Sequence, residues 1–154
     1  MTSFAGLDEV RAAVGSELGH SRWIEIPQPR IDAFAEATED RQWIHTDPVA
    51  AAAGPFGAPI AHGYLTLSLV SAFLEELLRV EGVAMAVNYG LNRVRFPAPV
   101  PAGARVRGHG QLAEVREIPG GIQTTVVVRV ESDRSDKPVC VAETVTRFLD
   151  HTAP

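Results

Sequence analysis

Cysteine, lysine and long apolar runs are the scarce features of this 154-residue sequence. Cys140 is the single cysteine, so no disulfide can form within the chain. Because Cys140 lies in an apolar alternation with no activating base beside it, we predict a buried, unreactive thiol and not a nucleophile. No stretch reaches the roughly 20 apolar residues of a membrane-spanning helix, and no secretion signal is visible. We therefore expect a cytoplasmic protein.

The charge distribution excludes further classes of partner. The net charge is -5 and no cluster of Lys and Arg is present, which argues against nucleic acid as a partner. No glycine-rich loop follows a predicted strand, which argues against nicotinamide cofactors and nucleoside triphosphates. The composition, 45% hydrophobic and 21% charged, is that of a globular protein. With no repeat and no linker, we expect a single domain over residues 1–154.

Apolar spacing predicts three helices. Residues at three- and four-residue intervals indicate a short amphipathic helix over about 4–18. Pro29 suits the first turn of a second helix, which leads to Asp40. Residues 64–78 are apolar on almost every side, which is typical of a buried helix. Glycines and prolines interrupt residues 50–60, where we expect an irregular loop.

The second half of the chain has the pattern of antiparallel strands. After Gly82, segments rich in Val and Thr alternate with turns, and Gly120 and Gly121 are expected to join two strands in a hairpin. Long strands and a buried helix together indicate an α+β fold in which the sheet wraps the helix. The expected strands cover residues 21–26, 84–96, 105–116, 122–131 and 139–149.

Two motifs carry candidate chemistry. The first is E-D-R-Q-W-I-H-T-D-P, with Asp40 and His45, and the second is A-H-G-Y, with His62 and Gly63. An isolated aspartate before a turn is usually a cap or a surface charge, and an isolated histidine is usually structural. Together the motifs resemble the MaoC-like, R-specific enoyl-CoA hydratases. The signature of that family is G-D-x-N-P-[LI]-H, then an acidic residue and proline, and an H-G pair before the central helix.

The resemblance covers roughly residues 31–148 and implies a single hotdog domain, an antiparallel sheet wrapped around a long central helix. This sequence departs from the signature at Glu39, where glycine is usual, at Gln42, where asparagine is usual, and at Trp43, where proline is usual. These departures are similar to those of the nodulation-protein-N-like branch. They affect the expected substrate more than the expected reaction.

The resemblance implies that Asp40 and His45 catalyse addition of water to trans-2-enoyl-CoA, giving R-3-hydroxyacyl-CoA in fatty acid metabolism. Histidine suits the abstraction of a proton from water near neutral pH, and a carboxylate can orient the water and exchange the second proton. The backbone N–H of Gly63, at the start of a buried helix, would bind the thioester oxygen. The resemblance also implies a homodimer and no cofactor beyond the CoA or acyl-carrier thioester itself. Supporting or substrate-lining positions would be Gln42, Ser71 and His62.

Alternative readings of the same residues stay open. A hotdog thioesterase would use the same scaffold, and a non-catalytic hotdog subunit would bind an acyl chain or another protein. His45, Asp47 and His62 have side chains that can bind a metal, but their spacing matches no helical His-x3-His pattern and no cysteine joins them. We therefore predict no metal site.

Overall fold

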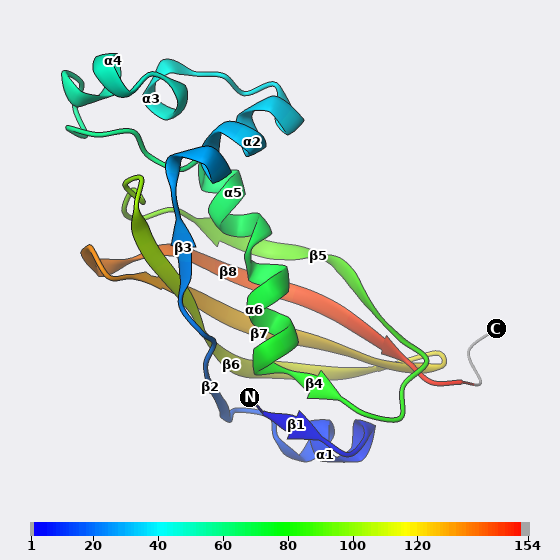
Figure 1. The fold of residues 1–154 in the computed structure, drawn as a ribbon. Coiled ribbons are helices and arrows are strands. Elements are labelled where there is room, and N and C mark those ends of the chain that lie inside the picture. The colour runs from blue at the N-terminus through cyan, green and yellow to red at the C-terminus, as the bar shows by residue number, and fades with distance from the viewer. Residues whose placement is uncertain (1, 152–154) are drawn as a thin grey trace.

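A curved six-stranded antiparallel sheet wraps a central helical segment in the computed structural model, which describes residues 2–151 (Figure 1). The strand order is β2-β6-β7-β8-β5, β3 also pairs with β6, and β1 and β4 form a separate parallel pair. The elements are β1 Ser3–Phe4, α1 Leu7–Ala12, β2 Glu17–His20, β3 Ile24–Ile26, α2 Gln28–Thr38, α3 Trp43–Thr46, α4 Pro48–Ala52, α5 Gly63–Ser68, α6 Val70–Leu77, β4 Arg79–Val80, β5 Met85–Arg95, β6 Ala104–Ile118, β7 Gly121–Ser132 and β8 Ser135–Leu149.

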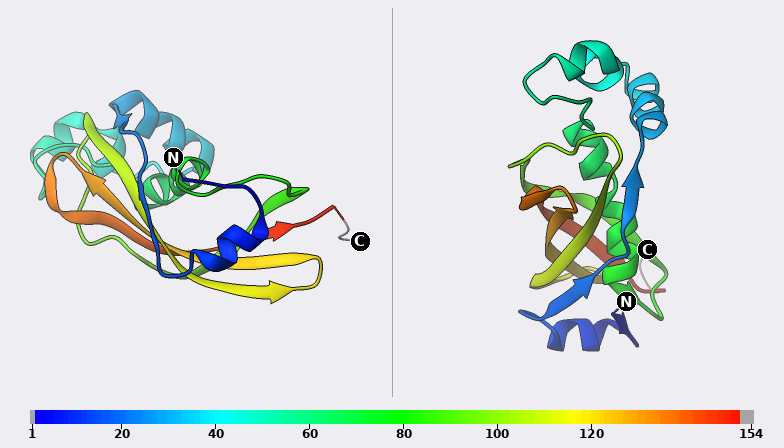
Figure 2. Two further views of the ribbon diagram at one scale, coloured as in Figure 1. Left: turned by 90° about the horizontal axis from the view of Figure 1, so that it is seen from below. Right: turned by 60° about the vertical axis from the view of Figure 1, so that its left-hand side comes forward.

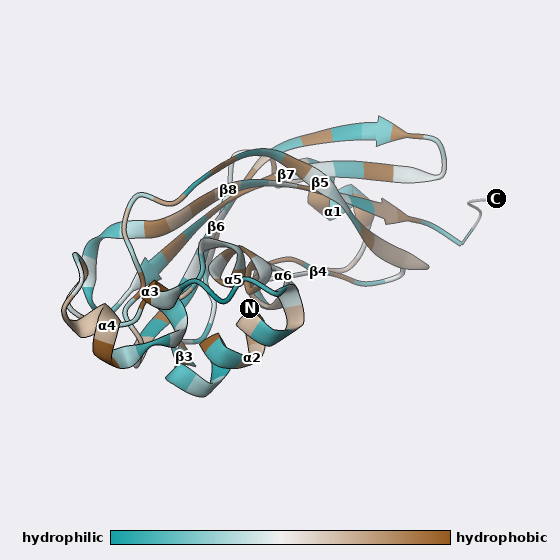
Figure 3. Ribbon diagram, turned by 90° about the horizontal axis from the view of Figure 1, so that it is seen from above, coloured by the Kyte–Doolittle hydropathy of each residue, from teal (hydrophilic) through white to brown (hydrophobic). Residues whose placement is uncertain are grey.

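The core lies between the sheet and α6. Hydrophobic and hydrophilic residues alternate along the long strands (Figure 3), so that one face of each strand turns towards the helix. Phe73 and Leu77 on α6 are fully buried against β6, where Gly108 and Gly110 occupy inward positions. A Cβ atom on Gly108 would lie 2.8 Å from the Cβ of Phe73. The glycines therefore allow the helix to pack directly on the strand.

The central helix differs from the single buried helix expected over about 64–78. It is divided at Leu69 into α5 and α6. Near the division the hydroxyl of Ser68 donates a hydrogen bond to the carbonyl of Tyr64 at 2.7 Å, a back-bond that commonly bends helices. Tyr64 and Ser71 are exposed, so the helix is covered by the sheet on one side and open on the other.

The strand pairing also differs from a simple meander. β6, β7 and β8 are consecutive neighbours, but β5 pairs with β8 at the far edge and not with β6, which follows it in sequence. Residues 96–103 cross from one edge of the sheet towards the other. Local hydrophobic pattern does not encode such long-range pairing.

Near the N-terminus the helix is shorter than the expected 4–18. α1 covers Leu7–Ala12 only, and Glu17–His20, which begins inside the expected helix, pairs with β6 as β2. Cys140 is fully buried, which confirms its predicted burial, and this burial raises the pKa of its thiol to about 11. That the thiol is unreactive stays a prediction. No helix within residues 2–151 is both long and apolar enough to cross a bilayer.

Three short helices gather at one end of the molecule. α2, α3 and α4 lie beyond the start of α5, whereas α1 and the β1–β4 pair lie at the opposite end (Figures 1 and 2). This arrangement brings the two sequence motifs together, because α3 carries His45 and α5 begins at Gly63.

Candidate active site

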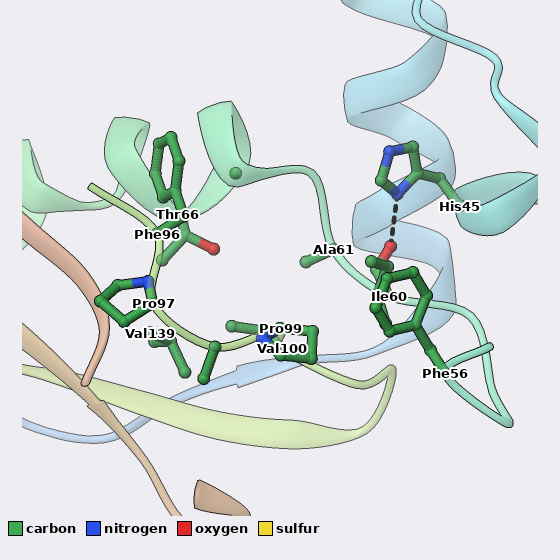
Figure 4. A pocket seen from close by; sticks show the side chains of 12 residues that line it. His45, Phe56, Ile60, Ala61, Thr66, Phe96, Pro97, Pro99, Val100 and Val139 are labelled. Carbon is green, nitrogen blue, oxygen red and sulfur yellow. Dashed lines mark hydrogen bonds between the residues drawn. The ribbon is translucent and has the colours of Figure 1, made fainter. Parts of the chain in front are cut away.

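His45 is held by one specific hydrogen bond. The side chain lies on α3 and is only 6% exposed, and its Nδ1 lies 2.6 Å from the carbonyl oxygen of Ile60 (Figure 4). A carbonyl oxygen can only accept, so Nδ1 carries the proton and donates. The neutral ring therefore has its lone pair on Nε2, which can accept a proton from a ligand.

Burial is the largest influence on the pKa of His45 and lowers it below the ordinary histidine value. The hydrogen bond to Ile60 and the carboxylate of Asp40 act in the opposite direction, and the interaction with His62 lowers the pKa further. The net shift is downward, so His45 is a neutral base at neutral pH.

Asp40 follows α2 on an exposed turn. Its Oδ1 lies 3.5 Å from the backbone nitrogen of Gln42, and the residue before it, Glu39, closes α2 in the left-handed region with φ 63°. Glycine tolerates this conformation because it has no Cβ. The glycine of the family signature thus corresponds to a position where this chain holds a glutamate in an unfavourable backbone conformation.

Replacing Glu39 by glycine should stabilise the protein by about 1 kcal/mol. Relief of the left-handed conformation, which costs a residue with a Cβ about 1–2 kcal/mol, is partly offset because glycine makes the unfolded chain more flexible. Urea denaturation measures the change. Glu39→Ala is the matched control, since alanine removes the carboxylate but keeps the Cβ, and it should give no such gain. Equal stabilisation by both variants would contradict the role of φ.

His62 joins the two sides of the site. It precedes α5, is 2% exposed, and its Nε2 donates to the backbone carbonyl of Asp40 at 2.9 Å. Its ring stacks on that of His45 with the centroids 3.8 Å apart, and the ring of Phe34 lies 5.1 Å away. One side chain therefore contacts both predicted catalytic residues.

Gly63 and His45 line the same cavity of about 300 Å³. Figure 4 shows His45 and Phe56 on one side of it and Phe96, Pro97 and Val139 on the other. Apart from His45 and Thr66 the lining side chains are apolar. The cavity thus combines an apolar wall with one imidazole and the first residue of a helix, features expected of a site for a small ligand with an apolar part and a polar part.

The other predicted site residues lie farther out. Gln42 is exposed, and its backbone carbonyl accepts from the backbone N–H of His45 at 3.0 Å. Ser71 lines a separate groove between α6 and β5 together with Asn88, and is absent from the wall of the cavity that contains His45. The structure therefore brings together Asp40, His45, His62 and Gly63, and leaves Ser71 outside this group.

The metal-binding trio considered from sequence is rearranged. Asp47 caps α4 by accepting from the backbone nitrogens of Val49 and Ala50, each at 3.0 Å. Asp40, and not Asp47, lies beside the two histidines. One potential metal-ligand atom from each of Asp40, His45 and His62 lies within 4.8 Å of the other two. However, stacked imidazoles direct their lone pairs along nearly parallel planes, whereas the ligands of one ion converge on it. The absence of a metal stays a prediction.

Two supporting groups were not identified from sequence. The carbonyl of Ile60 fixes the tautomer of His45, and the side-chain amide of Gln28 donates to the carbonyl of His45 at 2.7 Å and to Asp32 at 2.8 Å. A backbone carbonyl has no residue type by which a motif could reveal it. Gln28 could have been noticed as the polar residue immediately before Pro29.

Comparison with known proteins supports the family resemblance of the two sequence motifs. The family model described as the MaoC like domain matches residues 9–134. The chain belongs to the MaoC-like family. It is 48% identical over 150 residues to 3-hydroxyacyl-thioester dehydratase Z of Mycobacterium tuberculosis, covering 97% of this chain and 99% of that protein. It is 44% identical over 143 residues to Nodulation protein N of Rhizobium leguminosarum bv. viciae, covering 91% of this chain and 89% of the relative.

The fold is shared with solved structures of MaoC-like proteins. The (R)-hydratase from A. caviae involved in PHA biosynthesis superposes with a TM-score of 0.72 at 27% identity, covering 86% of this chain and 94% of that one. The predicted hotdog fold and the predicted nodulation-protein-N-like branch are both confirmed. Two of these relatives are named for an activity, a 3-hydroxyacyl-thioester dehydratase and an (R)-hydratase, which supports a hydratase or dehydratase role for this MaoC-like chain.

Proposed function

We propose that this MaoC-like protein is an R-specific enoyl-thioester hydratase that adds water to trans-2-enoyl-CoA, or an equivalent carrier thioester, and gives the R-3-hydroxyacyl product. The reverse reaction is the dehydration. The single observation that carries the proposal is the tautomer of His45, whose Nδ1–H is committed to Ile60 and whose Nε2 is left as a base next to Asp40.

The proposed reaction balances without a cofactor. Water attacks the β-carbon while its proton passes to Nε2 of His45, and the electron pair of the double bond moves towards the thioester oxygen. The backbone N–H of Gly63 stabilises the enolate oxygen. Asp40 orients the water and takes part in protonation of the α-carbon, which regenerates the carbonyl. The Asp40–His45 pair gives one proton to the α-carbon and regains one as the proton that His45 takes from water, so both residues end the cycle in their starting protonation states.

The test is incubation with crotonyl-CoA and longer trans-2-enoyl-CoA substrates, with the enoyl absorbance and free thiol measured together. Loss of absorbance without thiol release is the expected result. Thiol release would favour the alternative hotdog thioesterase, and no reaction with CoA or carrier thioesters would favour the non-catalytic acyl-binding subunit. Chiral analysis of the hydrated product tests the R configuration separately.

The pH dependence of hydration follows from His45. Protonation of the ring removes the base, so kcat/KM should fall as the pH decreases through the pKa of His45. Because burial lowers that pKa, the fall should be centred below the ordinary histidine value of about 6.5. A pH–rate profile in a buffer series of constant ionic strength measures it. A fall centred above the ordinary value would contradict the assignment of His45 as the base.

We also propose that the protein is a homodimer joined through β5. β5 pairs with β8 along one side, and no strand within residues 2–151 pairs with its other edge. Apolar side chains on this edge strand are exposed, which is an unusual pattern for an edge that faces water. Antiparallel pairing of two β5 strands would continue the sheet across both copies. The exposed side chains are Met85, Val87, Tyr89 and Leu91.

Sedimentation should therefore give a particle of twice the 16.5-kDa chain mass. Val87→Glu combined with Leu91→Glu should give monomers, because four buried charges would oppose each other across the interface. Val14→Glu, at an exposed apolar position away from β5, is the control and should leave the dimer intact. A wild-type monomer at micromolar concentration would overturn the proposed interface.

A further inference from the structure

His62 combines contacts that a merely space-filling residue does not need. It is almost completely buried between the ring of Phe34 and the ring of His45. Its Nε2–H is bonded to the main chain of Asp40, and its Nδ1 has no hydrogen-bonding partner among the groups of residues 2–151. Burying a nitrogen without a partner costs free energy, which a phenylalanine at the same place would avoid.

We infer that His62 is a positioning residue that couples Asp40 to His45: its hydrogen bond to the main chain of Asp40 fixes the turn of the acid, and its stacked ring limits the two imidazoles to one positive charge. The inference rests on the proposed hydration, for which His45 must begin the cycle as a neutral base. It assigns to His62 a role beyond holding the loop before Gly63.

The coupling follows from the directions of the contacts. A proton on Nδ1 of His62 would create a buried charge with no acceptor, 3.8 Å from the ring that must itself become charged during turnover. The geometry therefore favours one positive charge, on His45, over a charge on each of the two stacked rings. A neutral His62 presents the face of its ring to the imidazolium and keeps its Nε2–H on Asp40.

Few other charged groups face the pair. Asp40 and His62 are the ionisable side chains that influence His45, and its remaining influences are burial and the Ile60 carbonyl. α5 contributes Gly63 and Thr66 to the cavity wall, which are not ionisable, and the segment 96–100 contributes only apolar side chains. α2 presents Phe34 to His62. A change in the titration of His45 on substitution of His62 can thus be attributed to His62 itself.

Two variants separate the two contacts. His62→Phe keeps an aromatic ring on His45 and removes the bond to Asp40, whereas His62→Gln keeps an N–H donor and removes the ring. We expect His62→Phe to lower kcat by about 10- to 100-fold with little change in KM, because Asp40 loses its alignment. His62→Gln should recover part of that loss. In both variants the pKa of His45 should rise, since one influence that lowers it is removed.

The deciding measurement is a titration of the imidazole signals by NMR in the resting protein, with His45 assigned from the spectrum of His45→Gln. His151→Gln, at an exposed histidine, is the control and should not move the His45 titration. An unchanged His45 titration in both variants, with the same fall in kcat at every pH, would overturn the coupling and leave His62 purely structural.

The NMR result does not depend on turnover. A wild-type protein inactive on every enoyl thioester would contradict the proposed function, while the titration would still decide whether His62 and His45 are coupled. If His62→Phe fails to fold by circular dichroism, His62→Gln provides the same titration test.

Discussion

Replacing His45 by glutamine should lower kcat for hydration by about 10²- to 10⁴-fold, the usual contribution of a positioned general base. Glutamine cannot accept the proton of water, but its amide is of similar size and can donate to the Ile60 carbonyl that now accepts from Nδ1. KM should change little, because the cavity wall is otherwise retained. Stopped-flow or steady-state absorbance of the enoyl group measures both constants.

Asp40→Asn provides the second half of this prediction. It should lower kcat by a comparable factor, since the amide can neither exchange the proton nor direct water as a carboxylate does. The double variant should be scarcely slower than either single one, because the two residues act on one transition state as a unit. Additive losses in the double variant, or a single variant that keeps its rate, would contradict the assignment of the pair.

The control for these two substitutions should lie close to the site but take no part in the proposed reaction. Gln42→Asn restores the residue usual in the family signature, and the Gln42 side chain is exposed. The carbonyl of Gln42 that accepts from His45 is backbone and survives the substitution. The rate on a preferred substrate should therefore change by no more than a few-fold. A loss as large as that of His45→Gln would place Gln42 in the site.

The sequence was sufficient to predict the elements that depend on local pattern. α2 and the hairpin at Gly120 follow from proline placement, apolar spacing and glycine, and the proposed catalytic pair follows from the family resemblance of the motif. Pairing of β5 with β8 was missed because strand partners distant in sequence are chosen by the whole sheet. The split at Leu69 was missed because the apolar pattern continues through it.

In the site, too, residue types could be predicted from the sequence, whereas backbone geometry could not. Asp40, His45 and Gly63 could be named because their side chains, or the lack of one, are visible in the motifs. The carbonyl of Ile60 could not, although it decides which ring nitrogen of His45 keeps its lone pair. The stacking of His62 on His45 likewise depends on how α3 and α5 meet, which no local pattern contains.

The largest expected effect on stability is that of Phe73. Truncation to alanine should lower the free energy of unfolding by about 3–5 kcal/mol, because Phe73 is fully buried where α6 crosses β6. The strand below cannot fill the cavity, since Gly108 has no side chain to move into it. Ser71→Ala, exposed on the same helix, is the matched control and should change stability by less than about 0.5 kcal/mol.

Gly108→Ala tests the same contact from the opposite side. The added Cβ would lie 2.8 Å from the Cβ of Phe73, an atom that cannot rotate away, so α6 would have to move. Such overpacking should cost about 1–3 kcal/mol. Urea denaturation at one fixed protein concentration measures all three variants, because association would otherwise shift the apparent stability. Small losses for both Phe73→Ala and Gly108→Ala would mean that α6 does not pack directly on β6. The cavity beside Gly63, at the start of the same helical segment, would then need a different support.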